Sequence, residues 1–164
     1  MKSSVVHAFN PVFNEQSKIL MLGTMPSPGS VEAGFYYSHP QNRFWSVLAY
    51  ILKSETPVAP ADKKAFLLKN KIALWDVLAS CEIENASDST ITSPVFNDLT
   101  IITGAADIRG IFTTGRKATA LYENYIADKP GFMKTFYLPS TSPANRAVSF
   151  EKLVLAYKAI LEYL

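Results

Sequence analysis

The sequence has little of the chemistry on which metal proteins and disulfide-bonded proteins depend. It contains one cysteine, Cys81, and two histidines, His7 and His39, among 164 residues. A single cysteine excludes an internal disulfide, and also a zinc or iron–sulfur site held by several thiolates. The two histidines lie far apart and form no HxxxH pair. We therefore expect neither a metal ion nor a cofactor.

Long apolar runs and a strong excess of charge are also missing. No stretch of about 18 apolar residues occurs, so we expect no membrane-spanning segment. The first residues lack the apolar run of a signal peptide, which makes a cytoplasmic location the expectation. The net charge is only +2, from 16 basic and 14 acidic residues. Contact with nucleic-acid phosphates therefore depends on where individual cations lie. A local positive rim could be formed by Arg43, Arg116, Lys117 and Arg146, and the alternative is that these are scattered solvated charges.

The sequence does contain enough apolar residues to build one folded domain over residues 1–164. Hydrophobic residues make up 48% of the chain and charged residues 18%, which excludes wholesale disorder. Short apolar runs predict four buried strands, at 18–23, 72–76, 108–113 and 135–138. Helical spacing and composition predict five helices, at 42–53, 61–70, 95–103, 116–126 and from 150 to the end. The polar segment 80–94 is expected to be a loop.

Strands that alternate with helices predict an α/β fold with three layers, α/β/α, around a short, mainly parallel four-stranded sheet. Ligands of such sheets lie beyond the carboxyl ends of the strands. The loops that follow Leu22 and Leu138 should therefore border one crevice. On the second helix, Asp62, Lys63 and Lys64 are expected to form a solvated face.

The first of these loops leads to an aromatic cluster. Phe35, Tyr36 and Tyr37 precede the polar run His39-Pro40-Gln41-Asn42-Arg43. An aromatic ring can stack on a nucleobase while amide groups bind its edge, so the pattern suits a planar ligand. The alternative is that the aromatic residues only cover the edge of the sheet, as aromatic residues commonly do.

These segments resemble the motifs of the uracil-DNA glycosylase superfamily. Gly23-Thr24-Met25-Pro26-Ser27, followed by the block from Gly34 to Trp45, is similar to the first motif region, especially that of the mismatch-specific and hypoxanthine branches. The segment Leu138-Pro139-Ser140-Thr141-Ser142-Pro143-Ala144-Asn145 resembles the second motif. The run from Asp76 to Glu82 also looks typical of the hypoxanthine branch, and the resemblance covers most of the chain in the expected order.

The resemblance implies a monofunctional DNA glycosylase of base excision repair. Such an enzyme flips a deaminated base, here hypoxanthine in deoxyinosine, out of double-stranded DNA, and water replaces the base at C1′. The implied partner is double-stranded DNA bound by a monomer, with no membrane and no metal. Two alternatives stay open: a uracil-specific or mismatch-specific glycosylase, and a catalytically silent nucleic-acid-binding module.

The resemblance also implies which residues act. In the uracil branches an Asp or Asn two residues after the glycine positions the attacking water, but this chain has Met25 there. The hypoxanthine branch instead implies Asn42 as the catalytic residue. An amide can orient water or bind a purine edge, but it is a poor general base. A plain helix N-cap is the alternative role for Asn42.

The remaining site residues follow from the same resemblance. Tyr37 corresponds to the aromatic residue that stacks on the flipped base, with core packing as its alternative. Thr114 stands where similar sequences often have Asn, and an ordinary turn is its alternative. The full substrate-binding set is Gly23, Thr24, Met25, Pro26, Tyr37, His39 and Thr114. The DNA-binding set is Ser140, Thr141 and Ser142 at the phosphates, with Asn145 and Arg146 in place of an apolar wedge; the alternative is a polar turn between two prolines.

Overall fold

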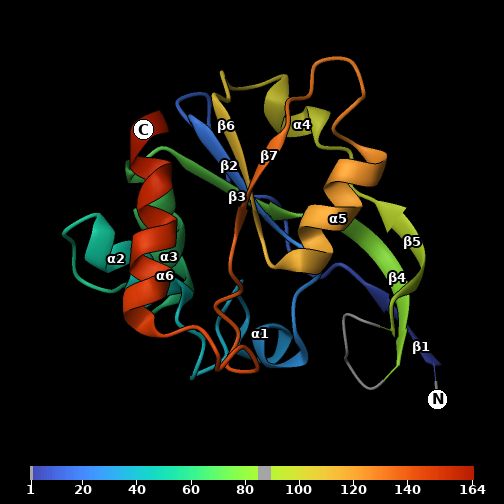
Figure 1. The fold of residues 1–164 in the computed structure, drawn as a ribbon, viewed down its shortest axis with the longest axis horizontal. Coiled ribbons are helices and arrows are strands. Elements are labelled where there is room, and N and C mark those ends of the chain that lie inside the picture. Colours follow the sequence, from blue (N-terminus) through green and yellow to red (C-terminus); the bar gives the residue numbers. More distant parts are fainter. Residues whose placement is uncertain (1, 85–89) are drawn as a thin grey trace.

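A four-stranded, all-parallel sheet forms the centre of the computed structural model, which describes residues 2–84 and 90–164 (Figure 1). The sheet confirms the predicted fold class. Three of its strands are buried along their whole length, because each is covered on both faces. The strands run in the order β3 (Ile72–Asp76), β2 (Ile19–Gly23), β6 (Gly110–Thr114) and β7 (Thr135–Leu138). Parallel pairing places Gly23 beside Asp76 at the ends of β2 and β3.

Helices cover both faces of this sheet. On one side lie α2 (Phe44–Ile51), α3 (Pro60–Lys69) and α6 (Phe150–Tyr157), which continues as a 3-10 helix, Lys158–Tyr163 (Figure 1). On the other side lie α4 (Thr100–Thr103) and α5 (Arg116–Tyr125), while α1 (Pro28–Ala33) lies at one end of the strands. Helix α6 begins at Ser149, whose side chain accepts a hydrogen bond from the Lys152 N–H, as expected.

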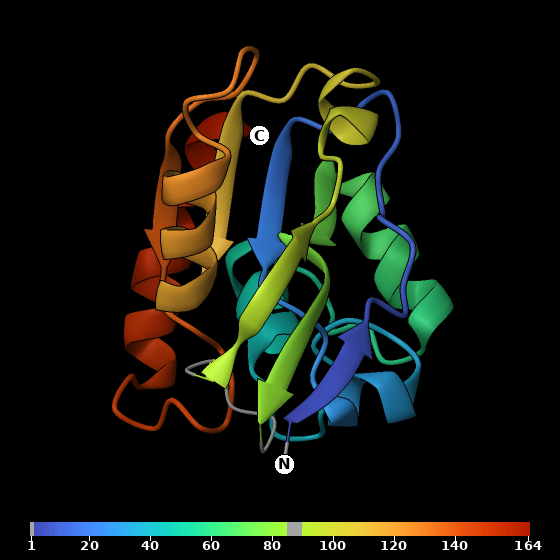
Figure 2. The ribbon, with the colours of Figure 1, turned by 90° about the vertical axis from the view of Figure 1, so that its right-hand side faces the viewer.

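A second sheet was not predicted. Strands β1 (Lys2–Val6), β4 (Leu78–Glu84) and β5 (Thr92–Phe96) form an antiparallel sheet in the order β1–β4–β5 (Figure 2). The prediction of a loop over 80–94 is therefore wrong, although residues 85–89 lie outside the described part of the chain. The helix predicted from Val95 is also wrong, because that residue belongs to β5 and only Thr100–Thr103 is helical. Pro94 argues against a central strand, but an edge strand such as β5 tolerates it.

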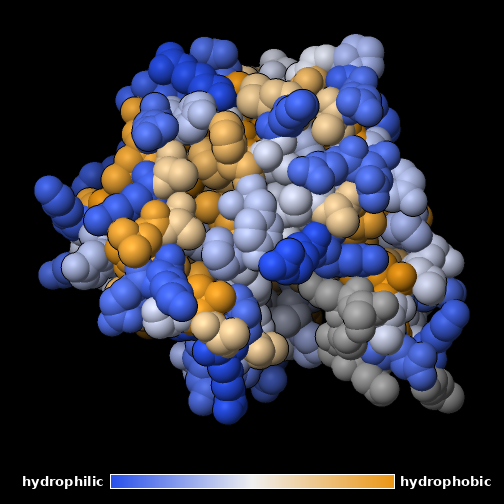
Figure 3. Space-filling view, viewed as in Figure 1, coloured by the Kyte–Doolittle hydropathy of each residue, from blue (hydrophilic) through white to orange (hydrophobic). Residues whose placement is uncertain are grey.

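Several large apolar side chains are exposed on the surface. On the face drawn in Figure 3, hydrophobic side chains gather over α6 and β7, where Phe136, Tyr137 and Leu155 are exposed. Within the described residues, no helix is long and apolar enough to cross a bilayer.

Candidate active site

A cavity of about 940 Å³ opens beyond the carboxyl ends of the parallel strands. Gly23, Asp76 and Thr114, the last residues of β2, β3 and β6, all line it. The loops that follow β2 and β7 complete its walls. Ligands of open parallel sheets bind in this position, so the cavity is the candidate active site.

The cavity brings together the sequence-predicted site residues with one exception. Arg146 is exposed and does not line it. The residues that do line the cavity are Gly23, Thr24, Met25, Pro26, Tyr37, His39, Asn42, Thr114, Ser140, Thr141, Ser142 and Asn145. Their convergence was predicted from segments far apart in the sequence, while the role of each residue stays a prediction.

The ring of Tyr37 is held on one face and at its hydroxyl. The ring stacks on that of Phe44, with 4.0 Å between the centroids and 13° between the planes. The Tyr37 hydroxyl is 2.9 Å from Oγ1 of Thr114, at the end of β6. The backbone of Tyr37 has φ of 51°, in the left-handed region that a residue with a side chain rarely adopts. These contacts fix the orientation of an aromatic ring at the cavity wall.

The Asn42 side chain lies at the start of α2 with its carbonyl oxygen fully occupied. Oδ1 accepts hydrogen bonds from the Phe44 N–H at 2.9 Å and from the Thr141 hydroxyl at 2.8 Å. A carbonyl oxygen has two lone pairs, so both are used. Within the described residues, Nδ2 donates to no protein group, and Asn42 lines the cavity. The N-capping alternative is thus partly right, since Oδ1 satisfies an N–H of the first turn, although Arg43 is the residue at the cap position.

The loop after β7 owes its shape to its own hydrogen bonds. The Asn145 amide donates to the Ser140 carbonyl at 2.9 Å, and the Ser140 hydroxyl accepts from the Ser142 N–H at 3.2 Å. At the N-cap of α2, the Arg43 guanidinium donates to the carbonyls of Asn145 and Val148 at 3.0 and 2.6 Å. Arg43 therefore buttresses this loop and does not join the positive rim expected from the sequence.

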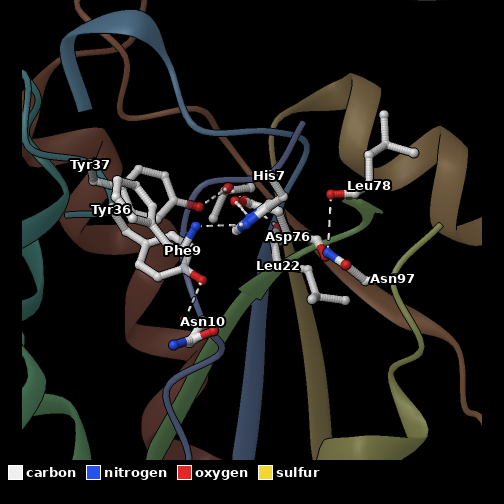
Figure 4. Close-up of polar contacts among 10 residues, drawn as sticks. His7, Phe9, Asn10, Leu22, Tyr36, Tyr37, Asp76, Leu78 and Asn97 are labelled. Carbon is white, nitrogen blue, oxygen red and sulfur yellow. Dashed lines mark hydrogen bonds and ion pairs between the residues drawn. The ribbon is translucent and has the colours of Figure 1, made fainter. Parts of the chain in front are cut away.

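A buried pair of side chains, Asp76 and His7, was missed as a site by sequence reasoning. The His7 ring and the Asp76 carboxylate face each other (Figure 4), with Nε2 2.7 Å from Oδ2. Nδ1 of His7 accepts from the Phe9 N–H at 3.1 Å, so the ring proton is on Nε2 and is donated to Asp76. Burial raises the pKa of Asp76, while the His7 hydrogen bond and the Gly23 backbone N–H act against that shift.

Gly23 leaves space for these groups. A Cβ atom on Gly23 would lie 2.5 Å from Oδ1 of Asp76 and 2.7 Å from the Tyr37 hydroxyl. Both distances are shorter than any ordinary contact. The end of β2 must therefore lack a side chain if the carboxylate and the tyrosine are to approach each other across it.

Comparison with known proteins identifies the family. The model of the family described as "Uracil DNA glycosylase superfamily" matches residues 11–164. The chain belongs to the uracil DNA glycosylase superfamily. The resemblance predicted from the motifs is thereby confirmed, and with it a DNA glycosylase that acts on DNA.

Individual relatives of this superfamily member are also DNA glycosylases by name. A hypoxanthine DNA glycosylase from Methanosarcina acetivorans is 34% identical over 147 residues, which cover 88% of this chain and 91% of that protein. Another, from Methanosarcina barkeri, is 33% identical and covers 84% and 87%. A solution NMR structure from M. acetivorans, described as a candidate uracil DNA glycosylase, has a TM-score of 0.78, 30% identity and coverage of 98% and 99%.

One cation of this glycosylase is placed otherwise than predicted. Lys63 was expected on a solvated face, but only 8% of it is exposed. Its ammonium donates to the Ser38 hydroxyl at 2.9 Å and lies 5.4 Å from the Trp45 ring centroid. Burial lowers the pKa of Lys63. The lysine thus joins α3 to the loop that carries Tyr37, whereas Asp62 and Lys64 are exposed as expected.

Proposed function

We propose that this glycosylase excises hypoxanthine from double-stranded DNA as a monofunctional, monomeric enzyme of base excision repair. The observation that carries the proposal is the arrangement of Tyr37 and Asn42 on one cavity wall, with Met25 where an acidic residue would hold water. Two relatives that are 33–34% identical, both named hypoxanthine DNA glycosylase, support the choice of base.

In this proposal the flipped base lies against the Tyr37 ring, on the face opposite Phe44. Base extrusion costs a few kcal/mol, and less for a poorly paired lesion. Because Phe44 and Thr114 already hold the ring, little ordering is needed when the base arrives. The hydroxyls of Ser140 and Ser142, which line the cavity, are the candidates to contact the DNA backbone, because the Thr141 hydroxyl and the Ser142 N–H are already engaged within the protein. Arg146, which is exposed, is a better candidate than Asn145 to fill the space that the base leaves.

The chemical step then breaks the bond between C1′ and N9, and the electron pair leaves with hypoxanthine. Water adds to the oxocarbenium-like C1′ and releases its proton to solvent. Since both lone pairs of Asn42 Oδ1 are engaged, the amide cannot accept a proton from water. Its Nδ2 hydrogens are available to stabilise the negative charge that develops on the departing base. A dissociative reaction of this kind does not need a carboxylate at the position of Met25 to activate the water.

A panel of lesions tests the proposal. Duplexes that contain deoxyinosine, deoxyuridine or deoxyxanthosine are incubated with the enzyme, and abasic sites are then cleaved with alkali. We expect hypoxanthine to be released fastest, and no strand break before the alkali step. Strong uracil release without hypoxanthine release would contradict the choice of base. Tight binding of lesion DNA without any base release would instead indicate a silent binding module.

A further inference from the structure

A buried lysine outside the cavity contacts the loop that carries Tyr37. Lys63 of α3 is only 8% exposed and does not line the cavity. Among the described residues no carboxylate forms an ion pair with its ammonium, which has one hydrogen bond, to Ser38, and the face of the Trp45 ring. A charge buried with so few partners is costly, and an apolar side chain of similar shape would avoid that cost. The chemistry proposed above does not use this lysine, so its burial needs another explanation.

The hydrogen bonds that lead from Lys63 have a fixed direction. An ammonium group only donates, so the Ser38 hydroxyl accepts from it at 2.9 Å. The one hydrogen of that hydroxyl is then donated to the Tyr36 carbonyl at 3.1 Å. A hydroxyl that accepts from a cation becomes a stronger donor, because hydrogen bonds in a chain polarise one another. Lys63 therefore both orients and strengthens the bond from Ser38 to Tyr36.

This bond joins the two chain neighbours of Tyr37, whose own backbone is in the left-handed region with φ of 51°. Such a conformation persists only where the surrounding structure fixes the residues around it. The Trp45 indole N–H donates to the same Tyr36 carbonyl at 3.0 Å, and the Ser38 N–H donates to the Ser30 hydroxyl at 3.3 Å. Both neighbours of Tyr37 are thus held in place.

We infer that Lys63 is a positioning residue for base excision: through the Ser38 hydroxyl it holds Tyr37 in the backbone conformation that lays its ring along the cavity wall. The inference rests on the proposed function, in which the flipped base stacks on that ring. Phe44 and Thr114 contact the ring itself, whereas Lys63 fixes the backbone that carries it. Without the ammonium, the Ser38 hydroxyl is free to turn toward other acceptors and the backbone of Tyr37 relaxes. Excision then slows, because a small displacement of a group that orients the substrate is costly to the rate.

The substitution Lys63→Met tests the inference because it removes the ammonium and keeps an unbranched side chain beside the Trp45 ring. We expect the single-turnover rate with deoxyinosine to fall at least about tenfold. The melting temperature should stay the same or rise, because an apolar group replaces a poorly compensated buried charge. The matched control is Lys64→Met, at the exposed neighbour on α3, which should leave the rate unchanged. A wild-type rate in Lys63→Met would overturn the inference.

A double-mutant cycle separates the positioning of Tyr37 from a merely structural role. If Lys63 acts through Tyr37, the substitution Lys63→Met should slow the Tyr37→Ala enzyme by less than about twofold. Equal slowing in the wild-type and Tyr37→Ala backgrounds would overturn the inference. In case Lys63→Met does not fold, Ser38→Ala keeps the lysine and removes the hydroxyl that transmits its effect. It should slow excision in the same way, and a normal rate in Ser38→Ala would contradict the inference.

Failure of the proposed function is distinguishable from failure of this inference. Dissociation constants are determined for a duplex that contains the 2′-fluoro analogue of deoxyinosine, in which the fluorine disfavours an oxocarbenium ion and prevents excision. A wild type that binds this duplex more tightly than an undamaged one, yet releases no hypoxanthine, contradicts only the proposed excision, and the cycle is then read from binding. A wild type that excises hypoxanthine and tolerates Lys63→Met contradicts only the role of the lysine.

Discussion

The Thr141 hydroxyl donates a hydrogen bond to Oδ1 of Asn42 at 2.8 Å, across 99 residues of sequence. This bond joins the two motif loops on either side of the cavity. Together with the Phe44 N–H, it orients the Asn42 amide so that its oxygen faces the protein. The group left to act on a substrate is therefore a donor, which fits a role at the leaving base better than a role as acceptor for water.

Replacing Asn42 with alanine should slow excision. We expect the single-turnover rate with deoxyinosine to fall at least about tenfold, equivalent to about 1.4 kcal/mol, because the donor to the leaving base is lost. The loss of the bond to the Phe44 N–H should also lower the free energy of unfolding by about 1 kcal/mol. Gln41→Ala, at an exposed neighbour that does not line the cavity, is the matched control. A wild-type rate in Asn42→Ala would remove this residue from the mechanism.

Adding a single methyl group at Gly23 should damage the site more than the fold. In Gly23→Ala the new Cβ would displace Asp76 Oδ1 and the Tyr37 hydroxyl, which His7 and Thr114 hold in place. We expect excision to fall at least about tenfold, with a loss of about 1–3 kcal/mol in stability. The control is Gly110→Ala, where the Cβ would meet Phe112 at 3.0 Å, away from the cavity. It should lose stability while its rate stays normal.

The pH dependence of excision should report the ionisation of Asp76. Asp76 lines the cavity, so its protonation as the pH falls should reduce hypoxanthine excision. Because burial raises the pKa of this carboxyl, the loss should begin at a higher pH than for an ordinary aspartate. The groups that face the carboxyl are His7, the Gly23 N–H and the hydroxyls of Tyr36 and Tyr37. In His7→Phe the hydrogen bond that opposes the shift is lost, so the midpoint should move to higher pH.

Protonation of Asp76 should have opposite effects on stability and on excision. A carboxyl whose folded pKa is raised contributes stability below its unfolded pKa and loses it as the pH rises through the folded pKa. As the pH falls through that window, Asp76 should therefore stabilise the fold while excision is lost. Circular dichroism and excision measured in the same buffers separate the two effects. A midpoint that does not move in His7→Phe would contradict the assignment to Asp76.

The sequence predicted the strands and loops that are determined by residues close together in the chain. Apolar runs such as 19–23 and 72–76 identify buried strands, and the turn-rich segments after them identify the loops of the site. The missed strand β4 alternates irregularly between buried and half-buried residues, and β5 contains Pro94, so neither has a strand signature. Their pairing with each other and with β1 decides the structure, and pairing depends on contacts distant in sequence.

The same reasoning explains what was missed in the site. Asp76 stood in a segment typical of the hypoxanthine branch, but nothing in its neighbours indicates that His7, 69 residues earlier, would meet it. His7 lies just after β1, a strand that was itself not predicted. Lys63 looked solvated because it stands between two charged residues, and only tertiary packing places it beneath Ser38. Asn42 and Tyr37 were predicted from a contiguous motif, and both line the cavity.

The platform formed by Phe44 and Tyr37 has a consequence for fidelity. The orientation of the Tyr37 ring is set before DNA binds, since Phe44 stacks on one of its faces and Thr114 is hydrogen-bonded to its hydroxyl. Attraction between stacked rings depends on their area far more than on their substituents, so undamaged purines would rest there about as well as altered ones. If the proposed function holds, discrimination against undamaged purines would come from the polar atoms that surround the base, several of which stand at the ends of the parallel strands.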